Sequence, residues 1–320
     1  KSRNIGQQIQ EEVDFHDHKK GTPTMGGIFI VFGTFAGYAL SHINFWTIGQ
    51  GFKVEITSMN VNVLLVFVLA LLMALVGLLD DFLKVKAGRN LGLKPSQKFS
   101  LQFLVGLISA YYFIYLNYES SFYFFSGLGF DIGILKWILV IFFIVGITNS
   151  VNFTDGLDGL VAGSSAISFG GILIISFWIY RHPEYYSKFI GQDFLTVEIS
   201  LLISAVAGAC LGFLWWNTNP AKIIMGDVGS HFIGALFPFI LLALGTDGLI
   251  FFFCFLFILE GTSVVIQILS FKYRKKRVFK MAPIHHHFEM NNWAETTIIV
   301  RFWVINGISV VIGLGLFYAD

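Results

Sequence analysis

The sequence contains few charged residues and almost no cysteine. Only 13% of its 320 residues are Asp, Glu, Lys or Arg, and the net charge is +1. This balance excludes nucleic acid as the main partner, because binders of a phosphate backbone carry a strong basic excess. Cys210 and Cys254 both lie inside apolar runs with no CxxC or Cys/His spacing, so neither a disulfide framework nor a zinc site is expected.

The beginning of the sequence also lacks two features. It has no initiator Met, and the basic segment KSRNIGQQIQ is not followed by a short apolar region with a small-residue cleavage site. The segment is therefore not interpreted as a signal peptide, and we expect the chain to begin inside a longer protein.

Apolar residues are abundant. The chain is 55% hydrophobic and 17% aromatic, with a mean hydropathy of +0.72, which is typical of membrane proteins. A hydrocarbon core of ~30 Å needs about 20 apolar helical residues to span it. Nine windows qualify, at approximately 25–46, 60–79, 98–118, 133–150, 158–180, 195–216, 230–246, 248–271 and 298–318. Backbone groups in lipid must be paired within their own segment, and runs such as LIFFFCFLFIL lack the alternation of a β-barrel, so the predicted fold class is an all-α polytopic transmembrane helix bundle.

Lysines and arginines orient this predicted bundle. Alternate loops on one side, 1–24, 80–98, 149–157, 217–229 and 272–297, contain 16 of the 21 basic residues. That side is cytoplasmic by the positive-inside rule. Every polar motif of the chain falls on the same side. We therefore predict one integral-membrane catalytic domain over residues 1–320, with these loops forming the active site.

The segment GLLDDFLK ends the second predicted span with adjacent carboxylates, Asp80 and Asp81, followed by Lys84. Charges at helical spans are costly and usually face a cavity or a partner. Neighbouring helical residues point about 100° apart, so the two aspartates are expected to act differently, one toward a metal and one toward a reacting phosphate. The alternative is a solvated helix end with Asp81 and Lys84 paired.

The segment NSVNFTDGLDGL repeats a carboxamide or carboxylate every third residue, at Asn149, Asn152, Asp155 and Asp158. In a helix this spacing keeps the groups on one slowly drifting stripe, which favours the lining of a common site. The alternative is that Asp155 or Asp158 caps the following helix, which would account for only part of the set.

Three further segments complete the polar motifs. NTNPAKIIMGDVGS contains Asn217 and places Asp227 near two glycines, a setting that suits a magnesium ligand or an N-cap. KKGTPTMGG could hold phosphate oxygens with its backbone amides and with Lys19 and Lys20, or it is simply a helix entry with positive-inside lysines. MAPIHHHFE contains three consecutive histidines that cannot all face one ion in a helix, so they are better suited to binding a phosphate or orienting a substrate.

Glu260, inside an apolar run, is left unassigned.

Acids, lysines and histidines gathered at one membrane face are the ingredients of magnesium-dependent phosphoryl transfer, in which the protein mainly positions groups and neutralises phosphates. A lipid nucleophile would explain why the site lies at a bilayer surface.

Five blocks of the chain together resemble the signature blocks of the polyprenyl-phosphate N-acetylhexosamine-1-phosphate transferases. These blocks are GTPTMGG, LLDDFLK, NSVNFTDGLDGL, NP followed by MGDVGS, and PIHHHFE. PIHHHFE favours the branch that transfers phospho-MurNAc-pentapeptide over relatives that use N-acetylglucosamine phosphate. The resemblance implies ten helices, the first of them upstream of Lys1. It also implies transfer from UDP-MurNAc-pentapeptide to undecaprenyl phosphate with Mg²⁺ in a bacterial cytoplasmic membrane, giving lipid I and UMP. The oligomeric state is not fixed, and a homodimer is one option.

The resemblance also assigns residues. The predicted catalytic residues are Asp80, Asp81, Asp227 and His285, and Asp227 is the predicted metal ligand. The predicted substrate-binding residues are Lys19, Lys20, Thr22, Lys84, Lys98, Asn149, Asn152, Asp155, Asp158, Asn217, His286 and His287. One position departs from the family, because Ile224 stands where many members have an aromatic residue before MGD, so no stacking with the nucleobase is assigned to it.

Two other functions remain open at this level. One is a transferase of the same fold that uses UDP-GlcNAc. The other is a transporter of an anionic solute, since helices interrupted by Gly and Pro with polar groups also mark transport sites. A transporter would place polar groups near the midplane with access from both faces, whereas here they gather at one edge.

Overall fold

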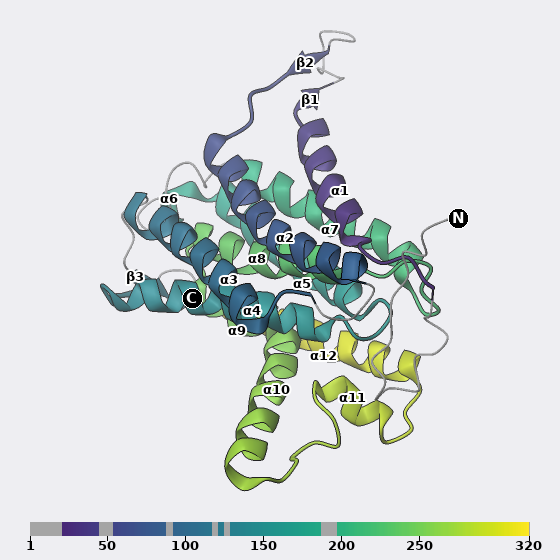
Figure 1. Ribbon diagram of the computed structural model, residues 1–320. Helices are drawn as coiled ribbons and strands as arrows, with labels where there is room; N and C mark the ends of the chain where they lie inside the picture. Colours follow the sequence, from purple (N-terminus) through teal and green to yellow (C-terminus); the bar gives the residue numbers. More distant parts are fainter. Residues whose placement is uncertain are drawn as a thin grey trace.

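The computed structural model describes residues 21–44, 54–87, 92–116, 121–124, 129–186 and 197–319, and these fold into a helical bundle (Figure 1). The long apolar helices are α2 (Val61–Ala87), α4 (Leu135–Thr154), α5 (Leu160–Arg181), α7 (Val197–Asn217), α8 (Gly226–Ala243), α10 (Phe255–Arg274) and α12 (Glu295–Ala319). The shorter helices are α1 (Gly27–Leu40), α3 (Pro95–Ala110), η2 (Tyr111–Leu116), α6 (Pro183–Tyr186), η4 (Asp247–Leu249), α9 (Ile250–Phe253) and α11 (Ile284–Glu289). The chain is thus a multi-pass membrane protein, as its hydropathy predicts.

The prediction of nine spans was wrong. Within the described residues, seven helices are long and apolar enough to cross a membrane, and α1 is a shorter apolar helix of 14 residues. At 1.5 Å per residue α1 extends about 21 Å, less than a ~30 Å hydrocarbon core. The window 98–118 also fails, because α3 contains Lys98 and Gln102 and gives way at Tyr111 to the π-helical turn η2.

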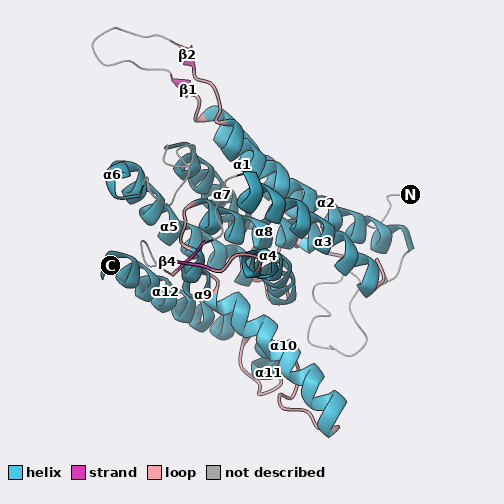
Figure 2. Ribbon diagram, turned by 90° about the vertical axis from the view of Figure 1, so that its left-hand side faces the viewer, coloured by secondary structure: helices cyan, strands magenta, loops and turns pink. Residues whose placement is uncertain are grey.

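The window 248–271 is not one continuous helix either. The short helix α9 ends at Phe253. The next residue, Cys254, has a backbone (φ −108°, ψ 16°) that is not helical, and α10 then starts in a new direction. Figures 1 and 2 show α10 projecting from the bundle toward α11. Much of its apolar surface is exposed as a result, including Ile268 and Phe271.

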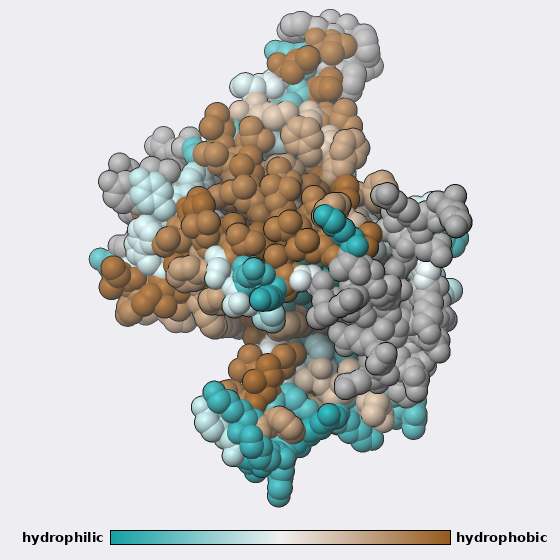
Figure 3. All heavy atoms as spheres, viewed as in Figure 1, coloured by the Kyte–Doolittle hydropathy of each residue, from teal (hydrophilic) through white to brown (hydrophobic). Residues whose placement is uncertain are grey.

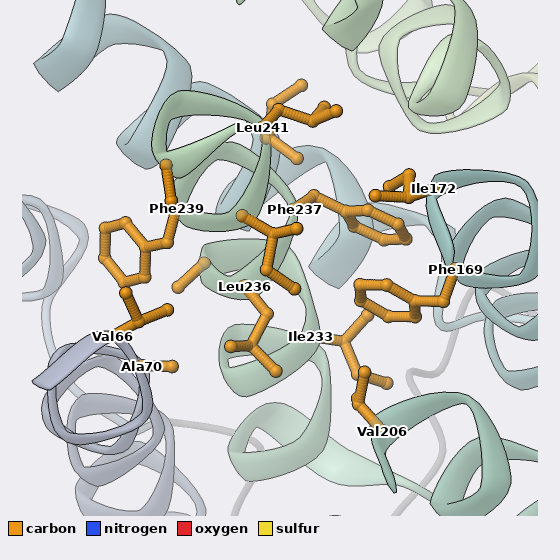
Figure 4. Packing of buried hydrophobic residues seen from close by; sticks show 14 of the residues in the cluster. Val66, Ala70, Phe169, Ile172, Val206, Ile233, Leu236, Phe237, Phe239 and Leu241 are labelled. Atoms are coloured by element: carbon orange, nitrogen blue, oxygen red, sulfur yellow. The ribbon is translucent and has the colours of Figure 1, made fainter. Parts of the chain in front are cut away.

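Helix α8 is the centre of the bundle. It packs against α1, α2, α4 and α5, and almost all of its residues are buried. Aromatic packing fills the space around it, as Figure 4 shows: the ring of Phe237 on α8 stacks on Phe169 of α5, with centroids 4.2 Å apart and planes at 6°. On the opposite side, Phe239 points toward Val66 and Ala70 of α2. The first turn of α8 is therefore held from several sides, and this turn contains Asp227.

Two short hairpins lie at the end of the bundle predicted to be extracytoplasmic. Strands β1 (Ile43–Asn44) and β2 (Glu55–Ile56) connect α1 to α2, and β3 (Ser121–Tyr123) pairs antiparallel with β4 (Gly129–Asp131) before α4. Lys136 ties the second hairpin to the bundle, because its ammonium donates to the Ser121 carbonyl and pairs with buried Asp247.

The surface changes character between the two ends. Figure 3 shows a broad apolar face over the middle of the molecule and hydrophilic residues gathered around the C-terminal end of α10 and the region of α11. The C-terminal ends of α2 and α4 and the first turn of α8 meet near α11. This region, called the polar end, contains most of the described motif residues.

Candidate active site

Three carboxylates from two helices meet at the polar end of the bundle. Asp80 and Asp81 lie on the last turns of α2, which continues to Ala87 rather than ending before them, and Asp227 lies in the first turn of α8. One ligand oxygen of each lies within 4.8 Å of the others, and all three side chains are buried or nearly so. This group is called the carboxylate cluster below.

Two lysines partly neutralise the carboxylate cluster. Lys84 Nζ lies 2.6 Å from an Asp80 oxygen and 3.0 Å from an Asp227 oxygen, and Lys98 Nζ lies 2.6 Å from the same Asp227 oxygen. Buried charges are costly unless they are paired in this way. With all five groups ionised, three negative and two positive charges leave a formal charge of −1, so the cluster would attract a further cation.

The two aspartates of α2 have different partners. Asp80 accepts a hydrogen bond from the Leu93 backbone N–H at 2.7 Å and faces the lysines. Asp81 accepts from the Val228 N–H at 3.1 Å and so lies against the first turn of α8. The two aspartates therefore differ in their hydrogen-bond partners, and the expected difference in their roles stays a prediction. The alternative of a solvated helix end is excluded because Asp81 is buried, although Asp81 does form an ion pair with Lys84 at 3.7 Å.

Glycines allow α8 to approach its neighbours closely enough to place Asp227. A Cβ at position 77 of α2 would lie 2.2 Å from the Asp227 carbonyl oxygen, which no side chain can do without moving one helix. Gly226 has a φ of +73°, a left-handed conformation that glycine adopts without a steric cost. The N-cap position of α8 is Met225, without a side-chain cap, so the capping alternative for Asp227 is excluded.

The motif at 149–160 is part helix and part loop, since α4 continues to Thr154 and α5 begins at Leu160. Asn152 joins the carboxylate cluster, because its amide donates to Asp227 at 2.9 Å and its carbonyl lies 3.4 Å from Lys98 Nζ. Asn149 lies one turn deeper and exchanges hydrogen bonds with Gln102. The capping alternative fails here as well, since α5 has Gly159 as its N-cap and no side-chain cap.

The rest of that motif connects separate segments of the polar end. Asp158 accepts from the Ala221 N–H at 2.9 Å, and its own N–H donates to Glu295 at the start of α12. Asn217 accepts from the Gly159 N–H and donates to the Ile223 carbonyl. Asp155 is the half-buried C-cap of α4. Asp158 and Asn217 therefore hold the loop before α8 rather than reaching the carboxylate cluster.

The three histidines point to three different partners, as the helical prediction required. His285 is fully buried, and its Nδ1 lies 3.2 Å from a Glu260 oxygen on α10, while a Cβ on Gly156 would lie 2.4 Å from its Nε2. His286 Nδ1 lies 2.5 Å from Glu289, and His287 accepts from the Lys280 N–H. The last turn of α4 and the two residues after it thus lead from the carboxylate cluster at Asn152 to His285 beside Gly156.

The predicted residues before α1 are only partly described. Lys19 and Lys20 lie outside the described residues. Thr22 is half-buried in the segment that leads into α1, and the next residue, Pro23, accepts a hydrogen bond from the Ile224 N–H. Ile224 itself is 9% exposed, so its side chain packs inside and does not present a flat face to a ligand.

The sequence is similar to known proteins of one family. The model of glycosyl transferase family 4 matches residues 63–245, and phospho-N-acetylmuramoyl-pentapeptide-transferase signature 1 matches residues 19–31. The phospho-N-acetylmuramoyl-pentapeptide-transferase of Frankia casuarinae is 40% identical over 98% of this chain and 89% of its own length. The chain belongs to the phospho-N-acetylmuramoyl-pentapeptide-transferase family. Proteins of the same name from Corynebacterium diphtheriae and Streptomyces griseus are 39% and 38% identical, covering 99% and 95% of this chain and 90% and 86% of their own lengths.

Sequence reasoning missed two buried polar residues, Gln102 and His231, and left a third, Glu260, without a role. Gln102 of α3 bonds both Asn149 and His231, and His231 lies one turn along α8 from Asp227. Gln102 and His231 sit within apolar stretches where periodicity gives no signal. The rule that an acid inside a span has a partner singled out Glu260, and the structure gives that partner as His285.

Proposed function

We propose that this chain transfers phospho-MurNAc-pentapeptide from UDP-MurNAc-pentapeptide to undecaprenyl phosphate, giving lipid I and UMP in peptidoglycan synthesis. The observation that carries the proposal is the carboxylate cluster with Lys84 and Lys98 at the polar end of the bundle. Negative charges of a pyrophosphate need cations and positioned donors nearby, and a lipid acceptor needs a site at the bilayer surface. Family membership supports the choice of donor.

The proposal includes a location. The chain is a multi-pass membrane protein, and the proposed membrane is the bacterial cytoplasmic one with the active site facing the cytoplasm. Residues 1–320 would act as one catalytic domain, with the loops of the polar end, together with the helix ends that flank them, forming its site. A homodimer stays a prediction.

The carboxylate cluster suits a magnesium ion. Mg²⁺ binds oxygen ligands at about 2.1 Å in octahedral geometry, which places ligand oxygens roughly 3–4.2 Å apart, and it usually takes one or two carboxylates. One oxygen of each of the three carboxylates lies within 4.8 Å of the others, so two of them could serve as ligands of one ion. We propose Asp227 as the main ligand, with Asp80 or Asp81 as the second. The ion would neutralise phosphate charge and favour attack at phosphorus.

The proposed reaction is a direct displacement. A phosphate oxygen of undecaprenyl phosphate attacks the sugar-side phosphorus of the donor, a new P–O bond forms, and the bond to the bridging oxygen breaks as UMP leaves. Asp80 orients the acceptor phosphate or takes its proton. Lys84 and Lys98, now paired with carboxylates, would turn toward the phosphates as negative charge enters the site.

The remaining predicted residues would hold the donor. Asn149, Asn152, Asp155 and Asp158 follow the end of α4 toward His285, and we propose this edge as the nucleotide-sugar cleft, with Asn217 fixing its wall. His285 would contact the reacting groups. His286, His287, Lys19, Lys20 and Thr22 would contact phosphates and the sugar. Their roles rest on the resemblance alone.

A two-step route through an aspartyl intermediate is the rival within this reaction class. It would form a covalent bond between a carboxylate, such as that of Asp80, and the phospho-sugar before the lipid binds. Incubating the protein with donor and Mg²⁺ but no acceptor should give an unmodified intact mass. A stable phospho-sugar adduct would contradict direct displacement.

An activity assay tests the function itself. Purified protein with UDP-MurNAc-pentapeptide, undecaprenyl phosphate and Mg²⁺ should release UMP and form a lipid-linked product, and UDP-GlcNAc in place of the donor should give neither. UMP release with UDP-GlcNAc only would assign the chain to the transferases of the same fold that use UDP-GlcNAc as the donor. Substrate flux into liposomes without UMP formation would indicate a transporter.

The Glu260–His285 pair gives a separate prediction. Glu260→Gln should lower kcat by about tenfold or more while leaving KM for the donor within about twofold, because a misplaced histidine loses proton-transfer efficiency but not the ground-state contacts. Glu260→Asp should recover part of the loss. Glu184→Gln, the same change at an exposed acid of α6, serves as the control. Equal kcat for Glu260→Gln and wild type would show that Glu260 has only a structural role.

A further inference from the structure

A groove runs between α1 and α7, on a side of the bundle separate from the carboxylate cluster. Its volume is about 650 Å³, and its lining includes Phe29, Gly33, Gly212, Trp216, Lys222 and Ile223. Helices α1 and α7 pack side by side along it, as Figure 1 also shows. This feature is called the α1–α7 groove below. Among the described residues, Lys222 is the only charged one that lines it.

Missing side chains create the hollow. A Cβ on Gly212 would meet no atom within 4 Å, so the helix surface there opens directly into the groove. On the facing helix a Cβ on Gly33 would meet Ala209 at 3.3 Å, which shows how closely α1 and α7 approach at that level. The groove therefore has an apolar wall that is hollow where Gly33 and Gly212 lack side chains. Phe29 flanks this wall.

The groove ends where a membrane interface is expected. Trp215 and Trp216 are exposed at the C-terminal end of α7, the end that also leads to Asp227. Exposed tryptophans and lysines are typical of the boundary between hydrocarbon and headgroups. The Lys222 ammonium lies 5.3 Å from the Trp216 ring centroid, which places a cation beside the apolar trough. An apolar trough with one cation at its polar end complements a ligand that has an acyl chain and an anionic headgroup.

The cation at the groove belongs to the segment that positions Asp227. The Lys222 N–H donates to the Trp216 carbonyl at 2.8 Å, and the Ile223 carbonyl accepts from the buried Asn217 amide. Two residues further, Met225 accepts a hydrogen bond from the Gly27 N–H, and α8 then begins. A ligand that holds Lys222 and Ile223 would thus restrain the segment that enters the first turn of α8.

We propose that the α1–α7 groove binds an anionic phospholipid of the cytoplasmic leaflet, with an acyl chain along Phe29, Gly33 and Gly212 and the phosphate at Lys222. The cytoplasmic leaflet supplies such lipids, and their headgroups attract lysines near the surface. Bound lipid steadies the segment before Asp227 and thereby raises turnover, a consequence that rests on the proposed function. The acceptor lipid offers similar chemistry, but within the described residues no side chain lining the groove is hydrogen-bonded or ion-paired to the carboxylate cluster.

Lipid retention tests the binding site without any need for turnover. The full chain is purified in detergent, titrated with phosphatidylglycerol or phosphatidylcholine, and examined by native mass spectrometry. Wild type should retain one phosphatidylglycerol in preference to phosphatidylcholine. Lys222→Gln should lower that preference by about fivefold, the effect of one lysine near an anionic surface. Gly212→Leu should abolish it by filling the groove.

Matched variants and a second readout complete the test. Arg181→Gln removes an exposed cation from the last turn of α5, outside the groove, and Gly315→Leu fills open space on α12, so both should behave as wild type. In vesicles of phosphatidylcholine, adding 30 mol% phosphatidylglycerol should raise the turnover of wild type and of the controls but not of Gly212→Leu, with the thermal stability of all variants within a few degrees.

Three results would separate the possibilities. Wild-type lipid preference in both Lys222→Gln and Gly212→Leu would overturn the proposed site. A raised KM for undecaprenyl phosphate in both, with unchanged retention of phosphatidylglycerol, would make the acceptor the occupant and overturn it as well. Groove-dependent retention by a protein that forms no UMP would refute the proposed function but support the lipid site.

Discussion

Asp227→Asn is expected to lower kcat by about a hundredfold to a thousandfold or more at any Mg²⁺ concentration. The substitution keeps the shape of the side chain but removes the negative charge that two lysines and the proposed ion share. Higher Mg²⁺ cannot restore a ligand that is missing from the site. The measurement is UMP release with UDP-MurNAc-pentapeptide and undecaprenyl phosphate over a range of Mg²⁺ concentrations.

Binding of Mn²⁺, followed by electron paramagnetic resonance, distinguishes loss of the ion from loss of the fold. Asp227→Asn should weaken Mn²⁺ binding, while the protein should still show a cooperative thermal unfolding transition. Asp131→Asn, the same change at an exposed acid of the β3–β4 hairpin, should leave both turnover and Mn²⁺ binding unchanged. Near-normal turnover in Asp227→Asn would remove Asp227 from the active site.

Gly77→Ala is expected to lower kcat by about a hundredfold, although position 77 carries no reactive group. The new Cβ would lie 2.2 Å from the Asp227 carbonyl oxygen and 2.9 Å from the Val228 nitrogen, and both are backbone atoms that cannot rotate away. Helices α2 and α8 must separate by about 1 Å or more, and misplacement of this size in an active site costs about 10²-fold. Overpacking should also destabilise the protein by about 1–3 kcal/mol.

The matched control is Gly170→Ala on α5, where a Cβ would meet no atom within 4 Å. It should retain both turnover and thermal stability. For Gly77→Ala, the loss of turnover should be accompanied by weaker Mn²⁺ binding at temperatures well below unfolding. Wild-type turnover in Gly77→Ala would mean that Asp227 keeps its place independently of the contact between α2 and α8.

The polar end could be predicted because its chemistry is unusual for an apolar chain. Asp80, Asp81 and Asp227 stood out as acids at the edges of predicted spans, and the structure brings all three together. The positive-inside rule placed these edges on one side without any knowledge of packing. Divergence of the three histidines also followed from helix geometry alone.

The number of spans and the helix boundaries could not be predicted in the same way. Hydropathy does not report length, so α1 was taken for a full span although it turns into a hairpin after Leu40. Nothing in the residues around Cys254 marks a break, because no Gly or Pro lies there, and the interruption depends on tertiary packing. Asp80, Asn149 and Asn152 were expected in loops, but they lie on helices that continue into the polar region.

Contacts between distant segments could also not be predicted from the sequence. The pairing of Glu260 with His285 and the close approach of Gly77 to Asp227 join residues whose separation along the chain carries no periodic signal. The first contact depends on how α11 packs on α10, and the second on how α2 packs on α8. Such packing is decided by shape across the whole bundle.

The most direct test of the carboxylate cluster as a metal site is an anomalous difference map from crystals of the active protein soaked in Mn²⁺. The account predicts a peak at about 2.1 Å from an Asp227 carboxylate oxygen, with Asp80 or Asp81 as a further ligand. A peak that lies only at other residues, in crystals of protein that forms UMP with Mn²⁺, would contradict it.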